Sequence, residues 1–207
     1  AMIIGVPIGL LTAVFLAKYC PKKLYKFIKP IINLMAGIPS IIYGFFGLVI
    51  LVPFVRDTFG GRGMSVLTAS ILLGLMILPT IISMSEASIR AVPQSYYEGG
   101  LALGASHERS VFFTVVPAAK SGIFASVVLG VGRAIGETMA VMMVAGNQTV
   151  IPEKITDGVR TLTTNIVMEM GYSTDLHREA LIATAVVLFV FILIINLSFS
   201  LLKRRSK

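Results

Sequence analysis

The chain has 207 residues, 56% of them hydrophobic, and its mean hydropathy is +0.88. This composition excludes an ordinary soluble domain, and several uncharged runs of about 20 residues predict an all-α, polytopic helical membrane protein surrounded by lipid. The formal net charge is +8, but the basic residues lie between the apolar runs, as membrane topology signals do, so no nucleic-acid partner is expected. A single cysteine, Cys20, predicts neither an internal disulfide nor a metal site.

The first uncharged run, residues 1–17, is long enough as a helix to cross most of the hydrocarbon core of a bilayer. It lacks a charged leader, so we expect no cleavable signal peptide and a chain that lacks the start of the intact protein. A basic connection with five lysines follows in residues 18–29, and we expect it to be a short loop. The positive-inside rule places this connection in the cytoplasm.

The second uncharged run, residues 30–55, contains several glycines and prolines. We expect a kink at Gly37 and Pro39, because proline removes a helical hydrogen bond and clashes with the preceding turn. The kink has two interpretations, a hinge or lining of a central pathway on one hand and ordinary packing on the other. A glycine-rich outer loop, residues 56–63, leads to the third run, residues 63–85.

A polar connection, residues 86–120, follows the third run and is too long for a simple turn. It contains two amphipathic pieces, residues 93–103 and 106–116. Gly104 suits a helix stop, and Ser106 suits the N-cap of the second piece. The sequence therefore predicts two short helices that meet at a sharp angle.

Two charges, Arg133 and Glu137, interrupt the fourth apolar run. A charge at the centre of a membrane helix costs about 2.5 to 3.5 kcal/mol and usually faces a bundle interior or a wet pathway. Their spacing of four puts both on one face of a continuous helix, within mutual reach. They are interpreted either as a structural ion pair or as part of a gated path for an anion, because a guanidinium offers a planar fork of donors that matches an oxyanion.

Residues 147–178 form the longest predicted outer loop, in which apolar residues from Val159 to Met170 recur at helical spacing and predict a short amphipathic helix. The last run, residues 180–202, ends in a basic tail that includes Lys207. With five membrane helices, twelve basic residues fall on the predicted cytoplasmic side and five on the outer side. The sequence thus predicts one transmembrane domain, residues 1–207, with a cytoplasmic C-terminus.

The stretch from Glu98 to Pro117 resembles the EAA loop of ABC-importer permeases, which couples a permease to its ATPase. That motif is Glu-Ala-Ala, three residues, Gly, nine residues, then an apolar position leading to Leu-Pro, whose leucine is replaced here by Val116. Glu98, Gly104 and Pro117 fall on the pattern, whereas Gly99 and Gly100 replace the two alanines. These replacements are small and are expected to preserve a narrow packing face.

Residues 37–47 and 134–147 are similar to the phosphate-importer permeases of the PstC type. The resemblance implies the type I ABC importer permease fold, with six membrane helices in the intact protein, and a location in the cell membrane. It implies a PstA-type second permease, a cytoplasmic ATPase dimer that carries ATP and magnesium, and an extracytoplasmic phosphate-binding protein. It also places Arg133 and Glu137 on the translocation route. No cofactor is expected on this chain, which shows neither a nucleophile constellation nor a phosphate-binding Gly-x-x-x-x-Gly-Lys loop.

Two alternatives remain open from the residues alone. Another oxyanion such as sulfate or molybdate would satisfy the same arginine as phosphate. A channel or an ion-coupled carrier would work without an ATPase, but it would have no use for a rigid cytoplasmic docking elbow between Glu98 and Pro117.

Overall fold

The computed structural model describes residues 1–205, which are helical apart from loops and one isolated bridge between Gly146 and Val159. Within that part of the chain, four helices are long and apolar enough to cross a membrane, and a bent pair provides a fifth if it counts as one span. The four are Met2–Tyr19, Ser40–Phe59, Val66–Arg90 and Asp175–Phe199, and the pair is His107–Ala118 with Lys120–Gly136. The prediction of an all-α, polytopic membrane protein is confirmed.

The chain divides into two compact units. The first unit comprises residue 1 with residues 38–76 and 132–200, and the second comprises residues 2–37, 77–131 and the stretch from residue 201. The basic residue Lys207, which contributes to the predicted cytoplasmic tail, lies outside the described residues.

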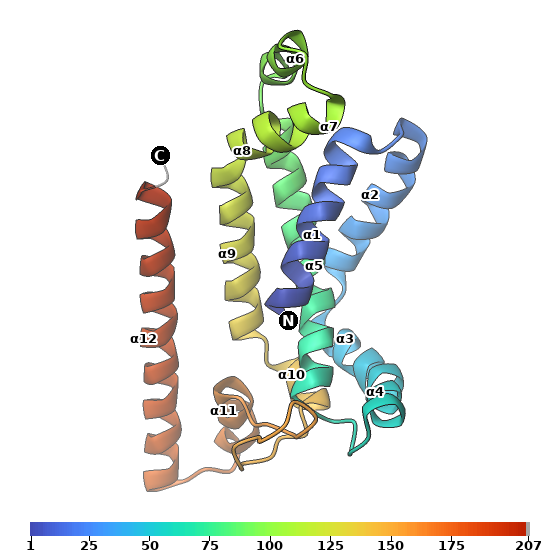
Figure 1. The fold of residues 1–207 in the computed structure, drawn as a ribbon. Coiled ribbons are helices and arrows are strands. Elements are labelled where there is room, and N and C mark those ends of the chain that lie inside the picture. The colour runs from blue at the N-terminus through green and yellow to red at the C-terminus, as the bar shows by residue number, and fades with distance from the viewer. Residues whose placement is uncertain (206–207) are drawn as a thin grey trace. The chain divides into compact units, whose positions relative to one another are not determined.

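The second unit contains the helices that Figure 1 labels α1, α2, α6, α7 and α8, together with parts of α5 and α9. Their bounds are α1 Met2–Val14, α2 Lys22–Gly37, α5 Val66–Arg90, α6 Gln94–Ala102, α7 His107–Ser110, α8 Val116–Ala118 and α9 Lys120–Gly136. Two π-helical turns, Phe15–Tyr19 and Val111–Val115, continue α1 and α7. Buried aliphatic residues of α1, α5 and the segment after α7 form one core, and Leu16, Ile32 and Ile82 form another.

The basic connection predicted as a loop over residues 18–29 is largely helical, because α2 already begins at Lys22. Lysine is a good helix former, and this helix also has an apolar side to bury. Ile32 of α2 is only 6% exposed and packs with Leu16 and Ile82. The loop prediction failed because charge alone does not distinguish a loop from an amphipathic helix.

The predicted kink at Gly37 and Pro39 is a complete break between two helices. α2 ends at Gly37, and α3 (Ser40–Phe46) begins after Pro39, whose φ of −58° and ψ of 142° are not helical. The residue before a proline is biased away from the helical region, so Ile38 also leaves the helix. The apolar run of residues 30–55 is therefore divided between α2 and the helical span Ser40–Phe59.

The first unit contains α3, α4 (Val52–Phe59), α10 (Met139–Val144), α11 (Leu162–Met170) and most of α12 (Asp175–Arg205), with parts of α5 and α9. A π-helical turn, Gly47–Leu51, joins α3 to α4. Its core gathers residues from α3, α5 and α10, among them Tyr43, Leu72, Met76, Val141 and Val144. This core holds α10 against α3.

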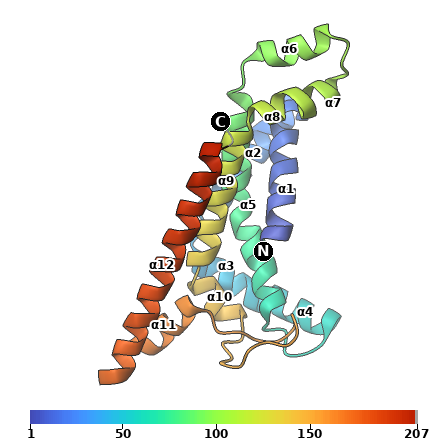
Figure 2. The ribbon, with the colours of Figure 1, turned by 60° about the vertical axis from the view of Figure 1, so that its left-hand side comes forward.

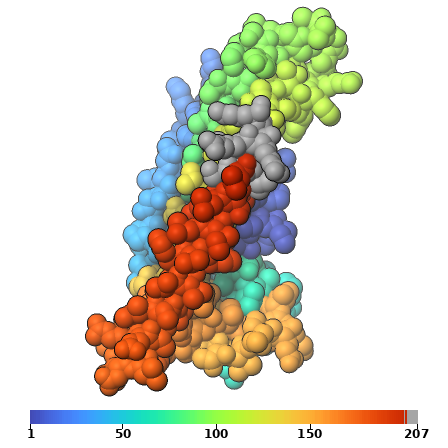
Figure 3. All heavy atoms as spheres, turned by 90° about the vertical axis from the view of Figure 1, so that its left-hand side faces the viewer, coloured from blue at the N-terminus to red at the C-terminus, as the bar shows by residue number. Residues whose placement is uncertain are grey.

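The amphipathic helix predicted in the outer loop is α11, and it begins with a capping box. Thr161 Oγ1 accepts a hydrogen bond from the backbone N–H of Thr164, and Thr164 Oγ1 accepts one from Thr161 N. Most of the large apolar side chains of α12 are exposed, and Figure 3 shows the outer surface of this helix in red. An uncovered apolar helix of this length suits a lipid environment.

Candidate functional site

The fourth apolar run is broken between its two charges. Arg133 lies in the last turn of α9, which ends at Gly136, and Glu137 lies in the non-helical link before α10. The prediction that Arg133 and Glu137 share one face of a continuous helix is therefore wrong.

Local hydrogen bonds explain the break. Glu137 Oε1 accepts a hydrogen bond from Ala140 N at 3.2 Å, and Thr138 Oγ1 donates one to Gly136 O at 3.2 Å. Such side-chain bonds to the backbone compete with the helical ladder, and glycine is a poor helix former. Glu137 thus caps the first turn of α10, a role that its spacing from Arg133 did not reveal.

The break provides polar backbone groups beside a cation. The last carbonyls of a helix lack partners within it, and its negative end favours a positive charge such as Arg133. Non-helical backbone at membrane depth is tolerated only where protein or a water-filled cavity surrounds it. α11 contributes one contact, from Thr163 Oγ1 to Glu137 O at 3.4 Å, so three elements meet at the break.

Tyr43 of α3 joins this site, and sequence reasoning missed it. Tyr43 lies close enough to Arg133 for the two groups to interact electrostatically, and its side chain is 8% exposed. A tyrosine in an uncharged run is typical of core packing. The hydroxyl of Tyr43 was the one feature in the sequence that could have indicated a role in the site. Tyr43 is therefore a neighbour of Arg133 near the break, after which Glu137 begins the link to α10.

Gly44 allows the close approach of α3 to α10. A Cβ at Gly44 would lie 2.8 Å from Met143 Sδ and 2.9 Å from the Cα of Ala140. Real Cβ contacts are longer than this, so only glycine permits the observed packing. Ala140, whose backbone N–H donates to Glu137, is thereby fixed against α3.

The predicted elbow between two short helices is confirmed. α6 ends at Ala102, Gly104 has a φ of +82°, and α7 begins after Ser106, whose side chain accepts a hydrogen bond from Arg109 N at 3.3 Å. Figure 2 shows α6 and α7 joined through this turn. A left-handed backbone of this kind favours glycine, as the sequence predicted for Gly104.

Gly100 and Gly99, the two replacements in the motif, have different surroundings. Gly100 packs directly against Ser110, where a Cβ would overlap the Ser110 hydroxyl, whereas a Cβ at Gly99 would meet nothing within 4 Å. Ser110 Oγ in turn donates to Tyr97 O at 2.8 Å. The absence of a side chain at Gly100 therefore allows α6 to pack closely on α7.

The remaining predicted residues of the elbow, Glu98 and Pro117, are both exposed and lie on α6 and α8 respectively. The elbow also exposes Leu103, 91% accessible, and Phe113, 77% accessible. These two residues line a hollow of about 370 Å³ with Gly100, Gly104, Ala105, Arg109 and Thr114. Exposed apolar side chains around a hollow are typical of a protein docking surface.

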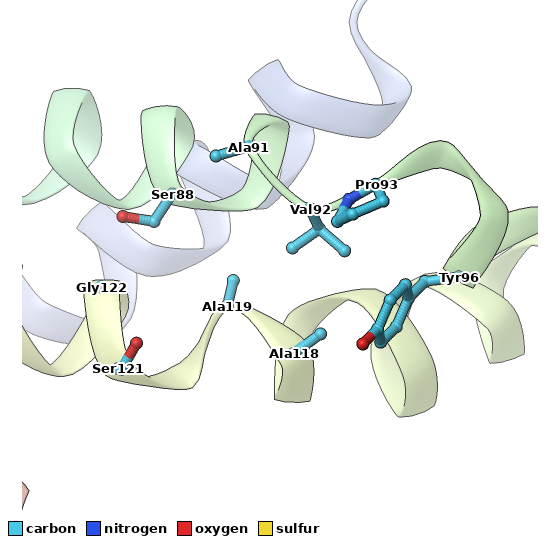
Figure 4. Close-up of a pocket in the computed structure, with 9 residues that line it drawn as sticks. All are labelled: Ser88, Ala91, Val92, Pro93, Tyr96, Ala118, Ala119, Ser121 and Gly122. Carbon is cyan, nitrogen blue, oxygen red and sulfur yellow. The ribbon is translucent and has the colours of Figure 1, made fainter. Parts of the chain in front are cut away.

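Another cavity, of about 340 Å³, lies where the end of α5 meets the start of α9 (Figure 4). It is lined by Ser88, Ala91, Val92, Pro93, Tyr96, Ala118, Ala119, Ser121 and Gly122. None of these nine residues carries a positive charge. Across residues 1–205, no three His, Cys, Asp or Glu side chains gather in a way that could hold a metal ion.

The family described as binding-protein-dependent transport system inner membrane component matches residues 5–207 of the chain. A probable ABC transporter permease, YqgH of Bacillus subtilis, is 41% identical over 94% of this chain and 65% of that protein. The phosphate transport system permease PstC of Mesorhizobium japonicum is 34% identical over 94% of this chain and 66% of that protein. PstC of Xylella fastidiosa is 36% identical over 92% of this chain and 65% of that protein. The chain thus spans about two thirds of the length of these relatives.

Among solved structures, the MetNI methionine ABC transporter in an inward-facing conformation contains a chain with a TM-score of 0.79 and 22% identity. The match covers 100% of this chain and 89% of that one. An amino acid ABC transporter with histidines matches with a TM-score of 0.63 and 18% identity, over 99% of this chain and 88% of that one. At these identities the likeness concerns the fold, which is that of ABC importer permeases.

Proposed function

Because the chain belongs to the family of binding-protein-dependent transport system inner membrane components, we propose that it is the permease subunit of an ATP-driven phosphate importer. The observation that carries the proposal is the helix break at Gly136, where Arg133 lies beside Tyr43 and Glu137. Several relatives named PstC support phosphate as the substrate.

In this proposal Arg133 interacts with the anion in transit. A guanidinium can donate two parallel hydrogen bonds to an oxyanion. A site that bound the anion too tightly would trap it. Glu137 resolves this conflict by competing for Arg133 when no anion is present, so that entry and release exchange one anionic partner for another.

The exchange requires Glu137 to leave the backbone of α10. Its Oε1 bond to Ala140 N is 3.2 Å long, and a hydrogen bond to a charged group contributes a net of about 1.5–3 kcal/mol. α10 has only six residues, and its first turn would lose this cap when Glu137 turns to Arg133. Substrate exchange and the conformation of α10 would then be coupled.

The proposal also includes the partners of such an importer. A PstA-type permease would complete the pathway, a cytoplasmic ATPase dimer with ATP and magnesium would supply energy, and an extracytoplasmic phosphate-binding protein would deliver the substrate. The exposed Leu103 and Phe113 of the elbow support ATPase docking at Glu98 to Pro117. This arrangement puts the elbow and the C-terminus in the cytoplasm, with the protein in the cell membrane.

The test measures uptake of labelled phosphate and labelled sulfate by proteoliposomes that contain the complete complex. Arg133→Gln should reduce phosphate uptake at least a hundredfold while the complex still assembles, because the amide keeps volume but loses the charge. Arg56→Gln, at an exposed position, is the matched control and should leave uptake unchanged. Sulfate uptake equal to phosphate uptake by the unsubstituted complex would contradict the substrate assignment.

Glu137 provides a second readout. Glu137→Gln keeps an oxygen that can accept from Ala140 N but loses the charge, so uptake should fall through slow release while α10 remains capped. Glu137→Ala should lose both the charge and the hydrogen bond that caps α10. A structural ion pair would behave differently, because the double variant Arg133→Gln with Glu137→Gln would recover assembly and uptake. Near-normal phosphate uptake by that double variant would overturn the pathway role.

A further inference from the structure

α2 of the second unit has one side that is firmly fixed against α5. Tyr25 Oη donates to Glu86 Oε1 at 2.8 Å, and Lys29 Nζ forms an ion pair with Glu86 Oε2 at 2.6 Å. Glu86 is 2% exposed, and Arg90 Nε contacts its Oε1 at 2.7 Å. A buried carboxylate with three donors fixes the rotation of α2 about its own axis, which determines what its other sides present.

The adjoining side of α2 carries three lysines that are not used in packing. Lys22, Lys23 and Lys26 are exposed, and they lie on one side of the helix at about 3.6 residues per turn. Within residues 1–205, none of the three has an acidic partner, in contrast to Lys29 with Glu86. Three unpaired positive charges on one helix face favour an anionic partner from outside the chain.

An exposed apolar strip runs beside the lysines along the same helix. It consists of Leu24, Phe27, Ile31 and Leu34, spaced by three and four residues, and Phe27 is 69% and Leu34 71% exposed. The side buried against α5 is a different one, because it carries Tyr25, Lys29 and Ile32. α2 therefore combines a basic face and an uncovered apolar face, which is typical of helices at a membrane interface.

We propose that this surface of α2, formed by Lys22, Lys23, Lys26, Phe27 and Leu34, binds anionic phospholipid. The phosphates of the headgroups contact the lysines, and the acyl chains lie along the apolar strip. The position in the chain supports this occupant, because Lys22 follows the apolar span Met2–Tyr19 by three residues and so lies where headgroups begin. An acidic segment of a partner protein would satisfy the lysines, but it would leave the long apolar strip without a match.

Native mass spectrometry of the full chain in detergent tests the proposal. Phosphatidylglycerol and phosphatidylcholine with identical acyl chains are added, and retained lipid is counted for each. The unsubstituted chain should retain phosphatidylglycerol in preference. The triple variant Lys22→Gln, Lys23→Gln, Lys26→Gln should lose that preference by more than tenfold, because each basic residue near an anionic surface contributes roughly fivefold.

Matched variants separate specific contact from net charge. Arg56→Gln, Arg62→Gln, Lys154→Gln removes the same charge at exposed positions elsewhere and should keep the preference, as should replacement of the three α2 lysines by arginine. Phe27→Ser with Leu34→Ser should weaken retention of both lipids. Equal phosphatidylglycerol binding by the triple lysine variant would overturn the proposal. The proposal would also be overturned if the triple lysine variant kept its lipid preference but no longer copurified with a partner subunit. The three lysines would then bind protein.

Discussion

The adjacent glycines Gly99 and Gly100 show how much a sequence motif reveals about the packing of a single residue. Both replace alanines of the EAA pattern, and the sequence predicts that both preserve a narrow packing face. The structure distinguishes them, because only Gly100 lies against Ser110. That contact joins residues ten apart in different helices, so no local pattern could reveal it.

This difference makes a prediction with a built-in control. Gly100→Ala forces its Cβ into the Ser110 hydroxyl and should destabilise the docking of α6 on α7 by about 1–3 kcal/mol, the usual cost of overpacking. Gly99→Ala meets nothing within 4 Å and should be neutral or slightly stabilising. Protease sensitivity of the elbow in the purified chain measures both variants, and equal sensitivity would show that the Ser110 contact does not hold α6.

Arg133 and Glu137 could be found from the sequence because charges are rare in apolar runs. Their arrangement could not, because the i, i+4 argument assumes a continuous helix. The bond from Ala140 N to Glu137 Oε1 and the close packing of α3 at Gly44 both favour the break, and neither can be seen in hydropathy. Tyr43 was missed for the same reason, since its position depends on packing between distant segments.

At the scale of elements, the elbow at Gly104 offers a test of coupling. Gly104 has a φ of +82°, and a Cβ at this position would meet nothing within 4 Å, so substitutions there change the backbone and not the packing. Gly104→Val should misdirect α7 and, in the proposed complex with an ATPase, lower transport per ATP hydrolysed by at least tenfold, because a β-branched residue is strained in this region. Gly104→Asn should retain most of the coupling, since asparagine tolerates the left-handed conformation. Wild-type coupling in the valine variant would contradict the elbow assignment.

α11 is held to the preceding loop by a charge cluster. Arg160 Nη1 contacts Glu169 Oε1 at 2.9 Å, and Arg160 Nε donates to Asn147 O at 3.1 Å. A hydrogen bond from Tyr172, followed by that from Arg160 and the charges of Arg160 and His177, holds the pKa of the Glu169 carboxyl below its ordinary value. Because the folded pKa is the lower one, Glu169 stabilises α11 above about pH 4.3, the ordinary glutamate value, and this contribution is lost as the pH falls through the folded pKa.

Hydrogen exchange of the α11 amides measures this effect as protection factors between pH 3 and pH 6, on the order of the range that a glutamate titrates. Protection should fall at the acidic end in the unsubstituted chain. Glu169→Gln should give lower protection that no longer depends on pH over this range. Glu153→Gln, at an exposed position, is the control, and an unchanged acid response of α11 in the Glu169 variant would exclude the cluster as its cause.

Element types followed from the sequence where local signals agree. The elbow helices have a proline, a glycine and a serine cap at the right places, and α11 has apolar spacing with a threonine cap. The prediction failed for α2, because lysines suit loops and helices equally and the deciding contact, Ile32 with Leu16 and Ile82, is long-range. The break at Pro39 could be predicted only as a kink. A proline disturbs a helix, but the sequence does not show whether the helix bends there or ends.

For the whole molecule, the number of membrane crossings depends on the bent pair His107–Ala118 and Lys120–Gly136. The two helices meet at an angle of 69°, and together they pass the length and hydropathy requirements of a single span. If the pair crosses the membrane, Leu103, which follows α6, and the loop before α11 lie on opposite sides. If the pair instead enters and leaves the membrane on one side, these two segments lie on the same side. The assignment of basic residues to the cytoplasmic side would then change as well.

Cysteine labelling distinguishes these two arrangements. In a Cys20→Ser background, Leu103→Cys and Ile151→Cys place single thiols at positions that are 91% and 86% exposed, so burial does not determine whether a reagent reaches them. With one crossing between them, a membrane-impermeant maleimide should label Ile151→Cys in intact cells and Leu103→Cys only after permeabilisation. This result is also required for an elbow that docks a cytoplasmic ATPase. Labelling of both thiols in intact cells would mean that the bent pair re-enters, which would place the elbow on the wrong side for any ATP-driven partner.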